Sequence, residues 1–302
     1  MREVIFLQRS TTSAISAICL LGCVVACDIS PSPDPNATLI DLAAIAHNDA
    51  AVLQSKNSAL AQQRHADSEE LISEIQRLCG TNSEGKLPES CSNEIVQGAV
   101  DKQAVSLKET ATESDAATRS AQAIVSAIDS APSESLGLLG QQLVDLVRAG
   151  AAAPQSGIAQ LNPRNEINKG TSKDDLIHDR ESLKKALDWE YSAIYGLGVA
   201  LAHSPAGTRT AVSDAITAHR DRVELLESSF AESFPNETIS RPEAAYEFSG
   251  YPEPHDAQSS RAFFDSLEAD SAAWWLHALS ESHSATWRAL CASLAAQSAA
   301  RR

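Results

Sequence analysis

Apolar residues recur every three or four positions along most of this 302-residue chain, and this spacing predicts amphipathic helices. Helix interiors reject proline, so long helices can lie only where proline is absent. The long proline-free stretches are residues 36–87, 89–131, 164–204, 206–234 and 255–302. Alanine is also abundant, which favours helix over strand. We therefore expect an all-α fold.

Aromatic content divides the chain into two parts. Residues 28–171 contain no Phe, Trp or Tyr, so their apolar seams are aliphatic and thin. We expect residues 38–149 to form an elongated helical module, either a long hairpin or three helices. Residues 150–172 contain Pro154 and Pro163 and are expected to be a linker.

The second part, residues 173–302, holds almost all of the aromatic side chains, which predicts a compact core there. A capping-box-like signal after Thr171 marks the start of its first helix. The four expected helices span about 173–203, 205–230, 256–280 and 284–300. Four helices with one long connection are typical of a bundle with a crossover.

Three ionisable residues fall on the apolar stripes of these helices. Glu190 and His219 each continue the three-to-four-residue spacing of apolar positions on the first and second helices. Glu268 lies on one of two possible stripes of the third helix, the stripe that contains Trp275. If the rival stripe, which contains Trp274, faces the core instead, Glu268 points away from the core.

A carboxylate inside a bundle costs free energy unless it is paired, protonated or bound to a metal. One interpretation is therefore a hydrogen-bonded Glu190–His219 pair that fixes the register of two helices. A second is a metal or small-ligand site formed by Glu190, His219 and Glu268. A third is that the stripes are assigned wrongly.

The second part of the chain resembles the ferritin-like domain of uncharacterised exported lipoproteins from high-GC Gram-positive bacteria. The residues that carry this resemblance are Glu190–Gly196, Ala218–Arg222, Ala244–Phe248, Glu268 and Ala272–Trp275. The resemblance implies a ferritin-like four-helix bundle. It implies no established activity, because the family is itself one of unknown function.

Ferritin-like di-iron proteins take a Glu from each of two helices and a Glu-x-x-His pair from each of the other two. Glu190 and Glu268 match the single glutamates, and His219 matches one histidine. Ile216 stands where the glutamate of that pair belongs, and the fourth helix offers no pair. Di-iron oxidase or ferroxidase chemistry is therefore not expected, and neither is a cofactor. The alternative is one mononuclear site for iron, manganese or zinc.

The first 26 residues are expected to be a secretory signal, because two arginines precede an apolar stretch that ends in small residues. Two adjacent segments resemble the bacterial lipobox, and they end at Cys23 and Cys27. We favour Cys27 as the lipidated residue because the chain behind it turns polar and proline-rich at once. Residues 27–37 would then form an extended tether.

Cysteine use agrees with export. Cys79 precedes Gly80, a helix-stop residue, and Cys91 precedes a helix-start signal at Ser92. We therefore predict a Cys79–Cys91 disulfide. Cys291 is left over and is expected to be a buried apolar thiol.

A net charge of −16 argues against nucleic-acid binding, which requires clusters of Lys and Arg. No nucleophile elbow, zinc-protease motif or phosphate loop occurs in the sequence. Gly196 and Gly198 lie within a helical pattern, which indicates close helix packing rather than nucleotide binding.

We therefore expect a cell-envelope interaction or scaffold protein without enzymatic activity. Its lipid would anchor it to the extracytoplasmic face of the cell membrane. Its partner would be an envelope protein, met by the aromatic loop at residues 246–251. The alternative is a redox protein that binds a metal or small ligand at Glu190, His219 and Glu268.

Overall fold

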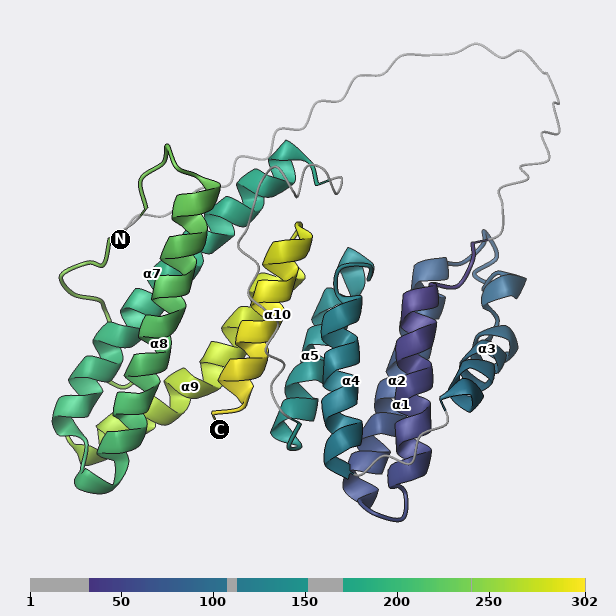
Figure 1. The fold of residues 1–302 in the computed structure, drawn as a ribbon, viewed down its shortest axis with the longest axis horizontal. Coiled ribbons are helices and arrows are strands. Elements are labelled where there is room, and N and C mark those ends of the chain that lie inside the picture. The colour runs from purple at the N-terminus through teal and green to yellow at the C-terminus, as the bar shows by residue number, and fades with distance from the viewer. Residues whose placement is uncertain (1–32, 108–112, 152–170, 240, 302) are drawn as a thin grey trace, which may run out of the picture. The chain divides into compact units, whose positions relative to one another are not determined.

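The computed structural model describes residues 33–107, 113–151, 171–239 and 241–301. The regular secondary structure of these residues is helical, and no strand occurs among them. The expected all-α class is thereby confirmed. The α-helices are α1 (Ala37–Leu53), α2 (Ser58–Cys79), α3 (Asn93–Ser106), α4 (Glu113–Ala127), α5 (Leu136–Arg148), α7 (Lys173–His203), α8 (Ala206–Ser233), α9 (Ala257–Ser280) and α10 (Ala285–Ala299) (Figure 1). The two short 3₁₀ helices are η1 (Glu89–Cys91) and η2 (Ser133–Ser135).

The first part of the chain differs from the expected hairpin or three-helix module, because its described residues form the five helices α1–α5. A polar turn interrupts the first proline-free stretch after Leu53, and Asn57 caps the next helix by accepting from the backbone N–H of Leu60. Such a cap competes with helix continuation. Absence of proline therefore permitted a long helix here but did not require one.

Cys79 and Cys91 lie at disulfide distance, with their sulfur atoms 2.08 Å apart. Gly80 ends α2 with a positive φ of 68°, a conformation that glycine adopts without a steric penalty. Ser92 then caps α3. The disulfide thus links the end of α2 to η1 at the point where the chain turns toward α3.

The helices of the second part lie within three residues of the expected ranges. Three of the four begin at a side-chain cap, and α8 begins directly after Pro205 without one. Ser172 and Asp175 form a capping box at α7, Asp256 and Ser259 form another at α9, and Ser284 caps α10. Helices α7 and α8 run antiparallel side by side, and α9 packs against both α7 and α10 (Figure 1).

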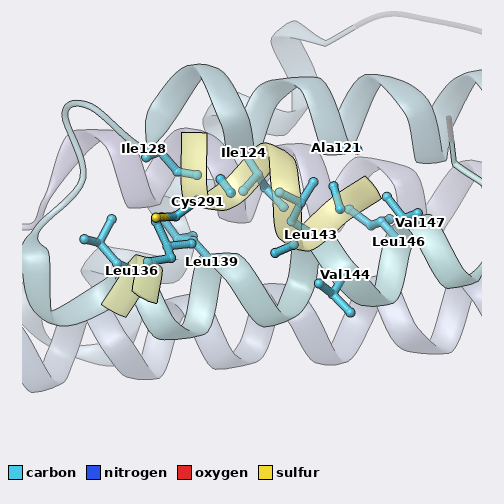
Figure 2. Close-up of a cluster of buried hydrophobic side chains, with 14 of the residues drawn as sticks. Ala121, Ile124, Ile128, Leu136, Leu139, Leu143, Val144, Leu146, Val147 and Cys291 are labelled. Atoms are coloured by element: carbon cyan, nitrogen blue, oxygen red, sulfur yellow. The ribbon is translucent and has the colours of Figure 1, made fainter. Parts of the chain in front are cut away.

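One hydrophobic core joins the two parts of the chain, because α5 packs against α9 and α10. Figure 2 shows Cys291 of α10 among the side chains of Ile128, Leu136 and Leu139. Burial raises the pKa of the Cys291 thiol well above its ordinary value, so this thiol is an apolar core group. Residues 33–302 form one compact unit.

Several predicted segments lie outside the described residues. These are the signal at residues 1–26, both candidate lipid-attachment cysteines (Cys23 and Cys27), most of the tether and most of the linker. Within the described part of the chain, no helix combines the length and the apolar character needed to span a bilayer.

The two glycines of α7 give a matched test of helix packing. A Cβ on Gly196 would lie 2.3 Å from Cζ of Phe263, whereas nothing lies within 4 Å of a Cβ on Gly198. Gly196→Ala should therefore lower the free energy of unfolding by about 1–3 kcal/mol through overpacking. Gly198→Ala should leave it unchanged or raise it by up to about 1 kcal/mol through helix propensity. Urea denaturation of both variants measures this, and equal effects would contradict the close approach of α7 and α9.

Candidate functional site

Glu190 and His219 meet in the interior between α7 and α8. The Glu190 side chain is fully buried, and His219 is 1% exposed. The Nδ1 atom of His219 lies 2.5 Å from Oε2 of Glu190. The helical spacing that placed both residues on inward stripes thus brings them into direct contact.

Glu268 joins this pair from α9. Its Oε1 atom lies 3.2 Å from Nε2 of His219, and the residue is 5% exposed. Phe263 and Trp275, which belong to the two rival stripes, are both buried. The reason is that α9 packs against α5, α7 and α10 and therefore buries a wider face than a single stripe.

Three further side chains complete the cluster, which we call the Glu190 network: Glu190, His219, Glu268, Arg222, Trp275 and Ser271. Nη1 of Arg222 lies 3.4 Å from Oε1 of Glu190, and it donates to Oγ of Ser271 at 3.2 Å. Trp275 donates its indole N–H to the same Glu190 oxygen at 3.2 Å. Arg222 is 4% exposed. Its place three residues after His219 on α8 is the sequence signal that could have found it.

Charge in the Glu190 network is balanced when His219 is protonated, with two carboxylates facing one imidazolium and one guanidinium. Burial alone lowers the pKa of His219, but its hydrogen bonds to Glu190 and Glu268 outweigh burial and leave the pKa raised above 6.5. Burial raises the pKa of Glu268, but the hydrogen bond and charge of His219 outweigh this and leave it lowered below 4.5. The raised pKa of His219 and the lowered pKa of Glu268 both favour the charged forms, and therefore the ion pair.

The geometry of the network bears on metal binding. Each ring nitrogen of His219 faces a different carboxylate, and the two nitrogens lie on separate edges of the imidazole. One ion could not contact the histidine and both glutamates in this arrangement. Across the described ranges, no three His, Cys, Asp or Glu side chains are grouped so that they could hold a metal ion. On α10, the ring of Trp287 is fully buried in the core.

A second buried charged group, which we call the Asp49 cluster, joins α1, α2 and α4. Nε of Arg64 lies 3.6 Å from Oδ2 of Asp49, and Nη1 of Arg64 lies 2.5 Å from Oδ2 of Asp67. Nη2 of Arg119 lies 2.7 Å from Oδ1 of Asp49. Ser120 also donates to Asp49. Burial raises the pKa of Asp67 to about 6 against the opposing charge of Arg64.

The Asp49 cluster was not predicted, although the sequence contains a signal for it. Asp49 continues the apolar spacing of α1 between Ala46 and Leu53, and Arg64 continues that of α2 after Leu60. The same helical periodicity that places Glu190 on a buried face therefore indicates these residues as well.

Another buried carboxylate, that of Asp179, links α10 to α7. Asp179 accepts the backbone N–H groups of His283 and Ser284 at 3.0 and 2.7 Å, immediately before the start of α10. A carboxylate at a helix N-terminus is favoured by the helix dipole and satisfies otherwise unpaired N–H groups. Asp179 therefore acts as a structural anchor.

The aromatic loop predicted as a contact surface packs against α7 and α9. Phe248 meets Phe263 edge to face, with ring centroids 5.4 Å apart, and Tyr246 lies 5.7 Å from Tyr195. The loop and the two helices border a cavity of about 150 Å³, which we call the aromatic pocket. It is lined by Trp189, Ser192, Tyr195, Gly196, Tyr246, Glu247, Phe248, Ser249, Tyr251, Phe263 and Leu267.

Residues 182–302 match the protein family described as "Domain of unknown function (DUF4439)". The match covers most of α7 and all of α8, α9 and α10, so it contains both the Glu190 network and the aromatic pocket. No curated protein and no solved structure matches the chain.

The ionised Glu190 network should make stability depend on pH. Because the folded pKa of His219 is raised, its contribution is fully present below pH 6.5 and is lost as the pH rises through the folded pKa. Each unit of pKa difference corresponds to about 1.4 kcal/mol. The difference in unfolding free energy between wild type and His219→Gln should therefore shrink between pH 6 and pH 9, as measured by urea denaturation. The exposed His203, replaced by Gln, is the control; a pH-independent difference for His219 would contradict the ion pair.

Proposed function

We propose that this protein is a lipid-anchored extracytoplasmic lipoprotein whose ferritin-like bundle serves as a cell-envelope interaction or scaffold module without enzymatic activity. The observation that carries the proposal is that the polar groups of the Glu190 network pair with one another. Both nitrogens of His219 are engaged by carboxylates, and Oε1 of Glu190 is contacted by Arg222 and Trp275. Groups that satisfy one another hold helices in register and leave little capacity for a substrate.

The ferritin-like assignment is supported by the order of the four helices and by the crossover between the second and the third. Glu190, His219 and Glu268 come from three of these helices and converge on the interior, as ferritin-like ligands do. The remaining ligand positions have been replaced, Ile216 being an apolar example on α8. We infer a bundle in which an ion-binding interior has become an ion-paired one.

Membrane attachment is supported by the signal-like first segment and the lipobox resemblance. Pro33 accepts a hydrogen bond from Ser90 at 2.7 Å, beside the Cys79–Cys91 disulfide. The six residue-to-residue steps from Cys27 to Pro33 span at most about 22 Å when extended. A lipid on Cys27 would therefore hold the disulfide end of the protein near the bilayer surface.

The negative charge of the protein would make its attachment to the membrane depend on the lipid. Removal of residues 1–26 would take away two arginines and one glutamate, so the mature chain would carry a net charge of −17. Anionic headgroups would repel such a protein. Its acyl chains would then have to supply the affinity for the membrane.

Metal analysis separates the proposed scaffold role from a metal-dependent one. The chain from Asp28 onward, exposed to Fe²⁺, Mn²⁺ or Zn²⁺ and then desalted, should retain no stoichiometric metal. Glu190→Gln and His219→Gln should each lower the free energy of unfolding, by about 3–5 kcal/mol, because they leave a buried charge without its partner. Stoichiometric metal in the wild type that both substitutions remove would overturn the scaffold role in favour of a redox or ligand-binding one.

Fractionation of expressing bacterial cells tests the anchor. Cys27→Ser should move the protein from the membrane to the soluble fraction, because the acyl chains are lost. Cys23→Ser is the matched control and should remain membrane-bound. Membrane association that survives both substitutions would contradict lipid anchoring, and release by Cys23→Ser alone would move the lipid to Cys23.

A further inference from the structure

The aromatic pocket combines many rings with negative charge. Six of its lining residues are aromatic, namely Trp189, Tyr195, Tyr246, Phe248, Tyr251 and Phe263. Glu247 is exposed at its edge, and no Lys, Arg or His occurs among the described residues that line it. Asp188 and Glu243 crowd the same region, since burial and then the charge of Glu243 raise the pKa of Asp188.

The rings of the pocket are held in fixed positions. The Phe263 ring stands at 79° to Phe248 and at 65° to Tyr251, so these rings meet as walls rather than as a flat stack. The hydroxyl of Tyr251 donates to Asp270 at 2.9 Å. The ring of Trp189 stacks on Trp274 at 10°. Rings fixed before binding lose little conformational entropy when a ligand arrives.

Ring faces carry the negative part of the aromatic quadrupole and attract cations that approach them. A cation in the aromatic pocket would gain this attraction from several rings together with the charge of Glu247. The volume of about 150 Å³ accommodates roughly five water-sized groups at about 30 Å³ each. A trimethylammonium group with its attached methylene has five heavy atoms.

The lining also discriminates between kinds of cation. A primary ammonium has three N–H donors and is strongly hydrated, so it needs several acceptors to replace water. Apart from tyrosine hydroxyls, the side-chain acceptors of the lining are Glu247 and two serines. The hydroxyls of Tyr246 and Tyr251 are already engaged, with the backbone N–H of Glu243 and with Asp270. A quaternary ammonium has no N–H group and presents methyl groups to the walls.

We propose that the aromatic pocket binds the trimethylammonium group of a small solute or a lipid headgroup. This inference deepens the proposed interaction role, since it rests on the aromatic loop being the recognition surface of the protein. Cation–π attraction to the rings holds the ligand, and Glu247 neutralises its charge at the mouth.

Calorimetric titration of the chain from Asp28 onward, which contains the whole compact unit, tests the proposal with three probes. Choline carries the trimethylammonium group, 3,3-dimethyl-1-butanol has the same shape without charge, and ethanolamine is the primary ammonium. Choline should bind at least about tenfold more tightly than either of the others. No saturable binding of choline, or equal binding of the neutral analogue or of ethanolamine, would overturn the proposal.

Two pairs of variants locate the binding. Glu247→Gln should weaken choline binding by about twofold to fivefold, as expected for an exposed charge, whereas Glu253→Gln in the same loop should leave it unchanged. Phe248→Leu removes a ring but keeps an apolar side chain, and should weaken binding by about tenfold. Tyr251→Phe keeps the ring and loses only its hydrogen bond to Asp270, so it should weaken binding less than Phe248→Leu does. Because Glu247 is exposed, its variant should keep the wild-type Tm. Equal effects of the Glu247 and Glu253 substitutions would place choline elsewhere.

Vesicle binding distinguishes the two sources of the ligand. Sedimentation with phosphatidylcholine vesicles but not phosphatidylglycerol vesicles, reversed by free choline, identifies a lipid headgroup. Choline binding without vesicle binding identifies a soluble ligand. Failure of choline to bind in metal-free protein would overturn this inference and leave the scaffold proposal standing, so the two outcomes remain separate.

Discussion

Burial of the Glu190 carboxylate constrains the second part of the chain more than any other single feature. A carboxylate removed from water must recover its lost hydration through donors in fixed positions. His219, Arg222 and Trp275 supply those donors from α8 and α9. The helices must therefore stand in one register, because a shift of either by one residue would carry its donor away from Glu190.

Small side chains make such close helix contacts possible. A Cβ on Gly196 would collide with Phe263, and a Cβ on Gly140 of α5 would lie 2.8 Å from side-chain atoms of both Leu276 and Leu279. Closely packed helices leave little room for water, so buried polar groups must satisfy one another. The Asp49 cluster and the Glu190 network solve this problem in the same way, by matching carboxylates with cations.

This division between a rigid interior and a chemically rich surface shapes the proposed function. The ionisable groups of the core are occupied in holding helices together, whereas the aromatic residues of the loop border an open pocket. Recognition at such a surface needs no reactive group, only rings held in place by their supports, such as Trp274 behind Trp189 and Asp270 behind Tyr251. A bundle that keeps those supports rigid is suited to display a binding site.

Local chemistry determined much of this structure. The caps at Ser172 and Asp256 set where α7 and α9 begin, and helical periodicity placed Glu190 and His219 on inward faces. Only tertiary packing decided that Glu268 turns inward, that Arg222 reaches Glu190, and that α5 packs on α9 and α10. The physical reason is that periodicity identifies the buried face of a helix. Which helix meets that face, and at what distance, depends on how side chains far apart in the sequence fit together.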